Sequence, residues 1–151
     1  MMRPALAAAT RRGWLAGAGA ALLAFAASAC TPPPHAAAVK CSSSNIADVA
    51  VKKDCTVTIA KFDKQASARI KVKTKRRQAF VTGRFTVQQG TVRIELRGNT
   101  GTKAEVVVSP GTPGTVQSTL RLRRQDSDFI LRFHPQGEVV GLDGQVSYEA
   151  R

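Results

Sequence analysis

Aromatic side chains are scarce in this sequence, and the scarcity argues against one class of partner. Phe, Trp and Tyr together make up 5% of the residues, and single-stranded nucleic acids bind largely by stacking bases on exposed aromatic rings. The aromatic residues after position 79 mostly fall at strand positions expected in a core: Phe80, Phe85, Phe129, Phe133 and Tyr148. Nucleic acid is therefore a poor candidate partner.

Histidine is rarer still, and this leaves little support for catalysis. Of the two histidines, His35 lies in a proline-rich stretch and His134 precedes Pro135 at an expected strand end, which is typical of a surface residue. A catalytic triad needs a Ser, a His and an acid close in space. The serines of Ser42-Ser43-Ser44 are instead typical of loop residues or local caps. We therefore expect no enzyme activity.

Motifs that bind metal ions are also missing. The sequence contains no EF-hand loop, no HExxH and no paired-cysteine zinc pattern. Asp126-Ser127-Asp128 offers two carboxylates that could bind Ca²⁺ or act as an acid pair, but a turn neutralised by Arg123 and Arg124 explains them better. No metal and no cofactor are expected.

The first thirty residues carry the pattern of an export signal. Arg11 and Arg12 precede an apolar run that ends in Ala27-Ser28-Ala29-Cys30, the order of charged, apolar and small residues found in secretory signals. The last four residues resemble the lipobox of bacterial lipoproteins. That resemblance implies that Cys30 is acylated, with palmitate among its fatty acids, and becomes the mature N-terminus on the cell membrane or the outer membrane.

Two alternatives to lipidation stay open. Ala27 stands where the lipoprotein family usually has Leu, so ordinary cleavage after Ala29 would leave a soluble secreted or periplasmic protein. An uncleaved anchor fits less well, because Leu15 to Ala29 falls short of the roughly 20 apolar residues that span a bilayer. Thr10 to Leu15 also resembles a twin-arginine export motif, although two arginines can simply charge the segment.

The chain after the signal is long enough for one domain. Three prolines in the stretch Thr31 to Ala38 favour an extended tether. The expected organisation is a signal peptide over residues 1–29, a lipidated Cys and Pro/Ala-rich tether over 30–40, and a folded domain over 41–151.

Cysteine number agrees with export. If Cys30 carries lipid, Cys41 and Cys55 remain as a pair in an oxidising compartment, and a disulfide between them is expected. The alternatives are weaker: a metal site would need further Cys or His residues nearby, and a Cys–His catalytic pair would need a cysteine that is not already used in a bridge.

From Thr56 onward, apolar residues alternate with polar ones, which predicts β-strands. About eight short strands separated by turn residues favour an all-β fold, an antiparallel β-sandwich, with a jelly roll or a closed β-barrel as alternatives. The only helical candidate is weak, over Asn45 to Lys53. We also expect Ala104 to Ser109 to be buried on both sides, and a last strand over Val146 to Tyr148 that begins after a turn at Asp143-Gly144.

Positive charge is the strongest chemical signal of the domain. The sequence has 23 Lys and Arg against 10 Asp and Glu; three of the basic residues precede Cys30, which leaves a net charge of about +10 and favours an anionic partner. Strand periodicity places several cations on one face of one strand, continuing into two arginines: Arg69, Lys71, Lys73, Lys75, Arg76 and Arg77. Further rows are expected on other strands: Arg93, Arg97, Arg121, Arg123 and Arg132.

These observations predict a membrane-anchored envelope lipoprotein whose basic face binds anionic lipid headgroups or an acidic polysaccharide. A structural or interaction subunit that binds an acidic exported protein is the alternative. A third interpretation gives the cations no ligand at all, because charges on strands also keep a protein soluble and discourage edge pairing.

Overall fold

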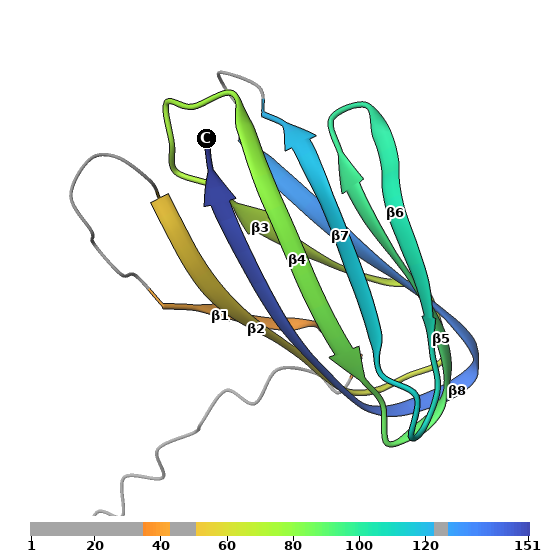
Figure 1. The fold of residues 1–151 in the computed structure, drawn as a ribbon. Helices are drawn as coiled ribbons and strands as arrows, with labels where there is room; N and C mark the ends of the chain where they lie inside the picture. The colour runs from red at the N-terminus through yellow and green to blue at the C-terminus, as the bar shows by residue number, and fades with distance from the viewer. Residues whose placement is uncertain (1–34, 43–50, 123–126) are drawn as a thin grey trace, which may run out of the picture. The chain divides into compact units, whose positions relative to one another are not determined.

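The computed structural model describes residues 35–42, 51–122 and 127–151, all within one compact unit of the chain, Thr31–Arg151. Every regular element of these residues is a β-strand (Figure 1). The strands are β1 (Ala38–Cys41), β2 (Val51–Phe62), β3 (Ala66–Lys71), β4 (Gln78–Thr86), β5 (Gln89–Gly98), β6 (Gly101–Val108), β7 (Gly114–Arg121) and β8 (Asp128–Ala150). In this part of the chain, no helix is long and apolar enough to cross a membrane.

The strands form where apolar and polar residues alternate, as the sequence predicts. In β4, Ala79, Val81 and Phe85 are completely buried while Arg84 and Thr86 are exposed. The same alternation runs through most of the other strands, because successive side chains of a strand point to opposite faces of the sheet. Each strand therefore contributes one apolar face to the core.

The long strand β8 organises the sheet. Its first part pairs with β3 and β5, and its second part pairs with β2 and β4, always antiparallel. Strands β1, β7 and β6 extend the sheet beyond β2, β4 and β5. We call β1-β2-β8-β4-β7 the first layer and β3-β8-β5-β6 the second layer.

β8 passes from one layer to the other at a bend rich in glycine. Gly137 and Gly141 have φ values of 83° and 64°, a region that favours glycine because it has no Cβ. The paired strand β5 is irregular at the same place, with a register shift between Gln89 and Thr91. β8 can therefore leave one layer and continue in the other without ending.

The two layers face each other across one hydrophobic core. The rings of Phe129 and Tyr148, near opposite ends of β8, meet edge to face with centroids 5.8 Å apart. Phe85 of β4 contacts Phe133 of the other layer in the same way at 6.1 Å. The predicted antiparallel fold of about eight strands is thus confirmed, as a sandwich-like structure made from one folded-over sheet.

The sheet is not closed into a barrel by hydrogen bonds among the described strands, since β1, β3, β6 and β7 each pair on one side only. Between β6 and β7 the gap is filled by side chains instead. A Cβ added to Gly114 of β7 would lie 2.6 Å from Val108 and 2.8 Å from Val106 of β6. The closed barrel is therefore wrong for this part of the chain.

Two expectations about β-strands are wrong. The apolar run Ala104 to Ser109 is not buried on both sides, because β6 is an edge strand with one face in solvent; Val107 is 51% exposed while Val108 is buried. Asp143-Gly144 is not a turn but lies inside β8, opposite Thr58 of β2 and Phe85 of β4. The last strand therefore begins at Asp128, well before Val146.

Only the last three residues of the weak helical candidate, Asn45 to Lys53, are described by the structure. Residues 45–50 lie outside the described residues, and Val51 to Lys53 belong to β2, where they pair with β8. The helical expectation is therefore wrong for Val51 to Lys53, because their pairing with the central strand overrides a weak local preference.

Candidate functional site

Cys30 lies outside the described residues, so its lipidation stays a prediction. The expected tether over residues 30–40 is shorter than predicted at its far end. Ala38 to Lys40 belong to β1, where Val39 packs against the core and pairs with Val57. The folded domain therefore begins by Ala38.

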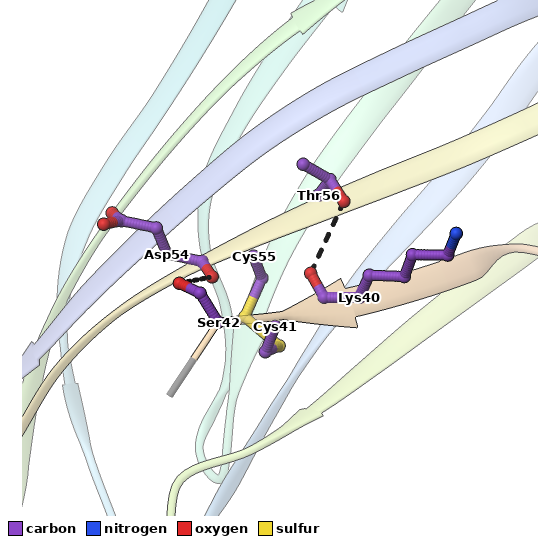
Figure 2. The surroundings of a disulfide bond; sticks show 6 residues. All are labelled: Lys40, Cys41, Ser42, Asp54, Cys55 and Thr56. Atoms are coloured by element: carbon purple, nitrogen blue, oxygen red, sulfur yellow. Dashed lines mark hydrogen bonds between the residues drawn. A yellow bond between two sulfur atoms is a disulfide. The ribbon is translucent and has the colours of Figure 1, made fainter. Parts of the chain in front are cut away.

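The predicted disulfide between Cys41 and Cys55 is confirmed. The two cysteines are directly opposed in the β1–β2 pair, and their sulfur atoms are 2.08 Å apart (Figure 2). Beside them, Ser42 donates its backbone N–H and its hydroxyl to the carbonyl of Asp54 at 2.9 and 3.1 Å, and the Thr56 hydroxyl donates to the carbonyl of Lys40 at 3.4 Å. The bridge therefore holds the short edge strand β1 onto β2.

The predicted anion-binding residues all lie at the surface but not on one strand. β3 ends at Lys71, so only Arg69 and Lys71 alternate on a strand face. Lys73, Lys75, Arg76 and Arg77 follow in the exposed connection to β4. Val72 is buried and continues the register of the β3–β8 pair by one residue: its N–H donates to the Ser127 carbonyl at 2.6 Å, and the Ser127 hydroxyl donates to its carbonyl. The alternation is lost beyond this point, where residues 75–78 are all exposed.

The fold adds two further arginines to this group. The Leu122 N–H donates to the carbonyl of Arg77 at 2.8 Å, and Gln78 pairs with Arg121, which brings the end of β7 beside the β3–β4 connection. The Arg151 N–H donates to the carbonyl of Gln78 at 2.8 Å. The ends of these elements gather at the same end of the domain (Figure 1). We call this surface the basic end: Arg69, Lys71, Lys73, Lys75, Arg76, Arg77, Arg121 and Arg151.

Two carboxylates of the described residues form ion pairs with cations of the basic end. Asp128 lies 3.4 Å from Arg69, and Glu149 lies 3.4 Å from Arg151. The guanidinium of Arg151 also lies over the Phe80 ring, 5.4 Å from its centroid. Because the cations of the basic end are close together at one end of the domain, their fields add instead of dispersing over the surface.

Two arginines of the second layer form ion pairs with carboxylates. Arg93 and Arg97 of β5 do not form an uncompensated basic row, because Glu95 lies between them at 3.1 and 3.6 Å, and Arg93 also lies 3.3 Å from Glu105. His134 of β8 approaches Glu95 from the neighbouring strand, with Nε2 3.3 Å from a carboxylate oxygen. Arg93 and Arg97 therefore belong to an ion-pair network and not to an uncompensated basic row.

Glu95 is the centre of that network and is 8% exposed. Burial beneath its neighbours acts to raise the pKa of Glu95, but the contact with His134 and the charges of Arg93 and Arg97 outweigh it, so that the pKa lies below its ordinary value. His134 is thus half-buried beside Glu95. The two residues lie on different strands, so the alternation pattern of either strand alone does not predict that they are partners.

The acidic turn is resolved in part. Asp128 forms an ion pair with Arg69 of β3, and the Ser127 hydroxyl donates to the Val72 carbonyl. Asp126 and Arg123 lie outside the described residues.

Comparison with known proteins adds a distant structural similarity. No family model matches the chain, and no curated protein is significantly similar in sequence. A chain from a solved structure of Bacillus endospore appendages, described as a family of disulfide-linked pili, is 16% identical over 72% of this chain and 96% of that one, with a TM-score of 0.39. Neither result assigns this chain to a family.

Proposed function

We propose that this protein is an exported lipoprotein, anchored through Cys30, whose basic end binds an anionic component of the cell envelope, either lipid headgroups or an acidic polysaccharide. The observation that carries the proposal is the gathering of eight cations from β3, the β3–β4 connection, β7 and the C-terminus at one end of the domain.

The spread of cations over the basic end favours an extended anionic surface as partner rather than a small ligand. A Lys or Arg close to an anionic membrane contributes about 1 kcal/mol, and several act together where they face the surface at once. No enclosed cavity is needed for this type of binding. The basic end projects its cations from a strand end and a connection, where long side chains can reach outward.

The anchor and the disulfide support a location at the envelope. Disulfides such as Cys41–Cys55 are typical of exported proteins. The residues between Cys30 and Ala38 can span at most about 28 Å when extended, so a lipid on Cys30 would keep the domain close to headgroups and envelope glycans.

The test is binding of the domain to vesicles of phosphatidylcholine with and without phosphatidylglycerol, and to an acidic polysaccharide such as polygalacturonate. The double variant Lys71→Glu, Lys73→Glu reverses two exposed cations at the basic end. We expect it to weaken binding to both anionic probes at least tenfold, and wild-type binding to fall steeply as salt rises to about 0.5 M.

A matched control reverses two cations at the other end of the domain. Lys64 lies in the exposed β2–β3 turn and Lys61 forms an exposed pair with Glu138 at 2.8 Å, so Lys61→Glu, Lys64→Glu makes the same charge change away from the basic end. Equal losses in both double variants would show that only net charge matters. Binding that survives Lys71→Glu, Lys73→Glu and high salt would overturn the proposal and favour an acidic protein partner or no ligand.

A further inference from the structure

The outer face of the first layer is hollowed into a groove, away from the basic end. Its volume is about 580 Å³, and residues of β1, β2, β8 and β4 line it. A second hollow of about 350 Å³ shares Arg84 and Gln145 with the first and adds Thr86 and Asp143. The two hollows therefore form one continuous surface across the middle of the sheet, of a size typical of small-molecule sites.

Unused hydrogen-bonding groups are concentrated in this groove. The register of β4 and β8 places Thr82 opposite Ser147 and Arg84 opposite Gln145. None of these four side chains bonds to another described residue. Together they offer two hydroxyls, an amide and a guanidinium, which can donate and accept at several closely spaced points.

The charges of the groove cancel, unlike those of the basic end. Lys40 and Arg84 are opposed by Asp54 and Asp143 around the same surface, and no ion pair joins any of these four side chains to another described residue. A polyanion would gain little from such a balanced site. A neutral ligand with many hydroxyl groups is the better match, because carboxylates accept its O–H groups while the amide and guanidinium donate to its oxygens.

The wall formed by β1 is held in place before any ligand arrives. Lys40, Cys41, Ser42, Asp54, Cys55 and Thr56 all line the groove, and the disulfide and three hydrogen bonds fix them to one another (Figure 2). A wall that is already ordered reduces the entropy lost on binding.

We propose that this groove binds a neutral oligosaccharide, with Thr82, Arg84, Gln145 and Ser147 as its hydrogen-bonding residues. The site is separate from the basic end and differs from it in the chemistry of its ligand. A protein with both surfaces would hold two kinds of envelope polymer, one by charge and one by directed hydrogen bonds.

The test is an NMR titration of the ¹⁵N-labelled domain, residues 31–151, with chitotetraose, cellotetraose and maltotetraose. We expect at least one of these neutral probes to cause saturable shifts of amides in β4 and β8 around the groove, with an affinity that changes less than twofold between low salt and about 0.5 M salt. Arg84→Ala and Gln145→Ala should each weaken that binding about tenfold.

The matched control substitutes exposed residues of the same outer face that do not line the groove. Thr115 and Gln117 lie on β7, opposite Arg84 and Thr82, so Thr115→Ala and Gln117→Ala should bind like the wild type. The proposal is overturned if none of the three probes gives saturable shifts, if the Arg84 and Gln145 variants bind normally, or if the shifts map to the basic end. Vesicle binding by the same Arg84 and Gln145 variants should stay unchanged, which separates this result from that of the proposed function.

Discussion

Among the described residues, Glu95 is the one charged side chain that the fold buries. A buried carboxylate is costly unless it is paired, and here Arg93, Arg97 and His134 surround it at 3.1 to 3.6 Å. The network lies on the outer face of the second layer, where the side chains of two arginines and one histidine cover the carboxylate. At this scale the molecule uses some of its positive charge for stability rather than for binding.

Glu95→Gln tests this role by removing the charge and keeping the shape. We expect the free energy of unfolding to fall by about 1–3 kcal/mol at neutral pH, because three cationic or hydrogen-bonding partners lose their acceptor. Urea unfolding followed by circular dichroism measures the change. Glu105→Gln is the control, since Glu105 is exposed and, among the described residues, forms an ion pair only with Arg93; the substitution should lower the free energy of unfolding by less than about 1 kcal/mol.

The pH dependence of that difference has a defined direction. The pKa of Glu95 is lowered in the folded protein, so its contribution to stability is present above the unfolded pKa of about 4.3 and is lost as the pH falls through the lower folded pKa. The wild type and Glu95→Gln should therefore converge in stability below about pH 4. A difference that persists unchanged in acid would show that the carboxylate charge is not the cause.

At the scale of the element, β8 and β1 are held in the sheet in different ways, β8 by strand pairing and β1 by a disulfide as well. β8 has a partner on both sides over most of its length and carries residues of both layers. Gly144 allows it to pass the ring of Phe85, since an added Cβ would lie 2.4 Å from that ring. β1 has only four residues and one partner strand, so it depends on the covalent bond to Cys55.

Removing the disulfide should therefore destabilise the domain chiefly at β1. For Cys41→Ala, Cys55→Ala we expect a loss of about 3 kcal/mol, the chain-entropy value for a loop of this length. Hydrogen exchange should accelerate at the β1 amides more than at those of β8. Reduction of the wild type with a thiol should reproduce both effects, and a double variant as stable as the wild type would contradict the role assigned to the bridge.

At the scale of the whole molecule, the basic surface and the surface with balanced charges lie at different places on the domain. The basic end gathers cations where β3, β7 and the C-terminus meet, while the groove on the first layer balances two cations with two carboxylates. On the second layer, Glu95 and Glu105 neutralise Arg93 and Arg97 in an ion-pair network. The net charge of the protein therefore does not predict which of its surfaces is basic.

Cys30 decides whether these surfaces act at a membrane. We expect mass spectrometry of protein extracted from membranes of the producing bacterium to find a diacylglyceryl-modified and acylated Cys30 as the first residue. Cys30→Ser should release the protein or leave it as an uncleaved precursor, because stable anchoring requires more than one acyl chain. A soluble product that begins with an unmodified Cys30, or after Ala29 in the wild type, would contradict lipidation.

The sequence by itself determined most of the strands and most of their buried faces. Period-two alternation places Val57 and Ile59, or Phe129 and Phe133, on the core side whichever strands become neighbours. Cysteine number predicted the disulfide on the assumption that Cys30 carries a lipid, because Cys41 and Cys55 then have only one possible pairing. The run from Arg69 to Arg77 could be identified as exposed because its apolar partners Ile70 and Val72 occupy the alternate positions.

Only the tertiary structure decided which of these strands lie together. Local patterns do not contain strand order, so nothing in the sequence placed Arg121 and Arg151 beside Arg77, or His134 against Glu95. The turn predicted at Asp143-Gly144 failed for the same reason: glycine there accommodates the ring of Phe85 from a neighbouring strand, a contact between residues distant in sequence. Long-range pairing fixes the surfaces of a β-protein, because each face combines residues whose positions are set by different parts of the chain.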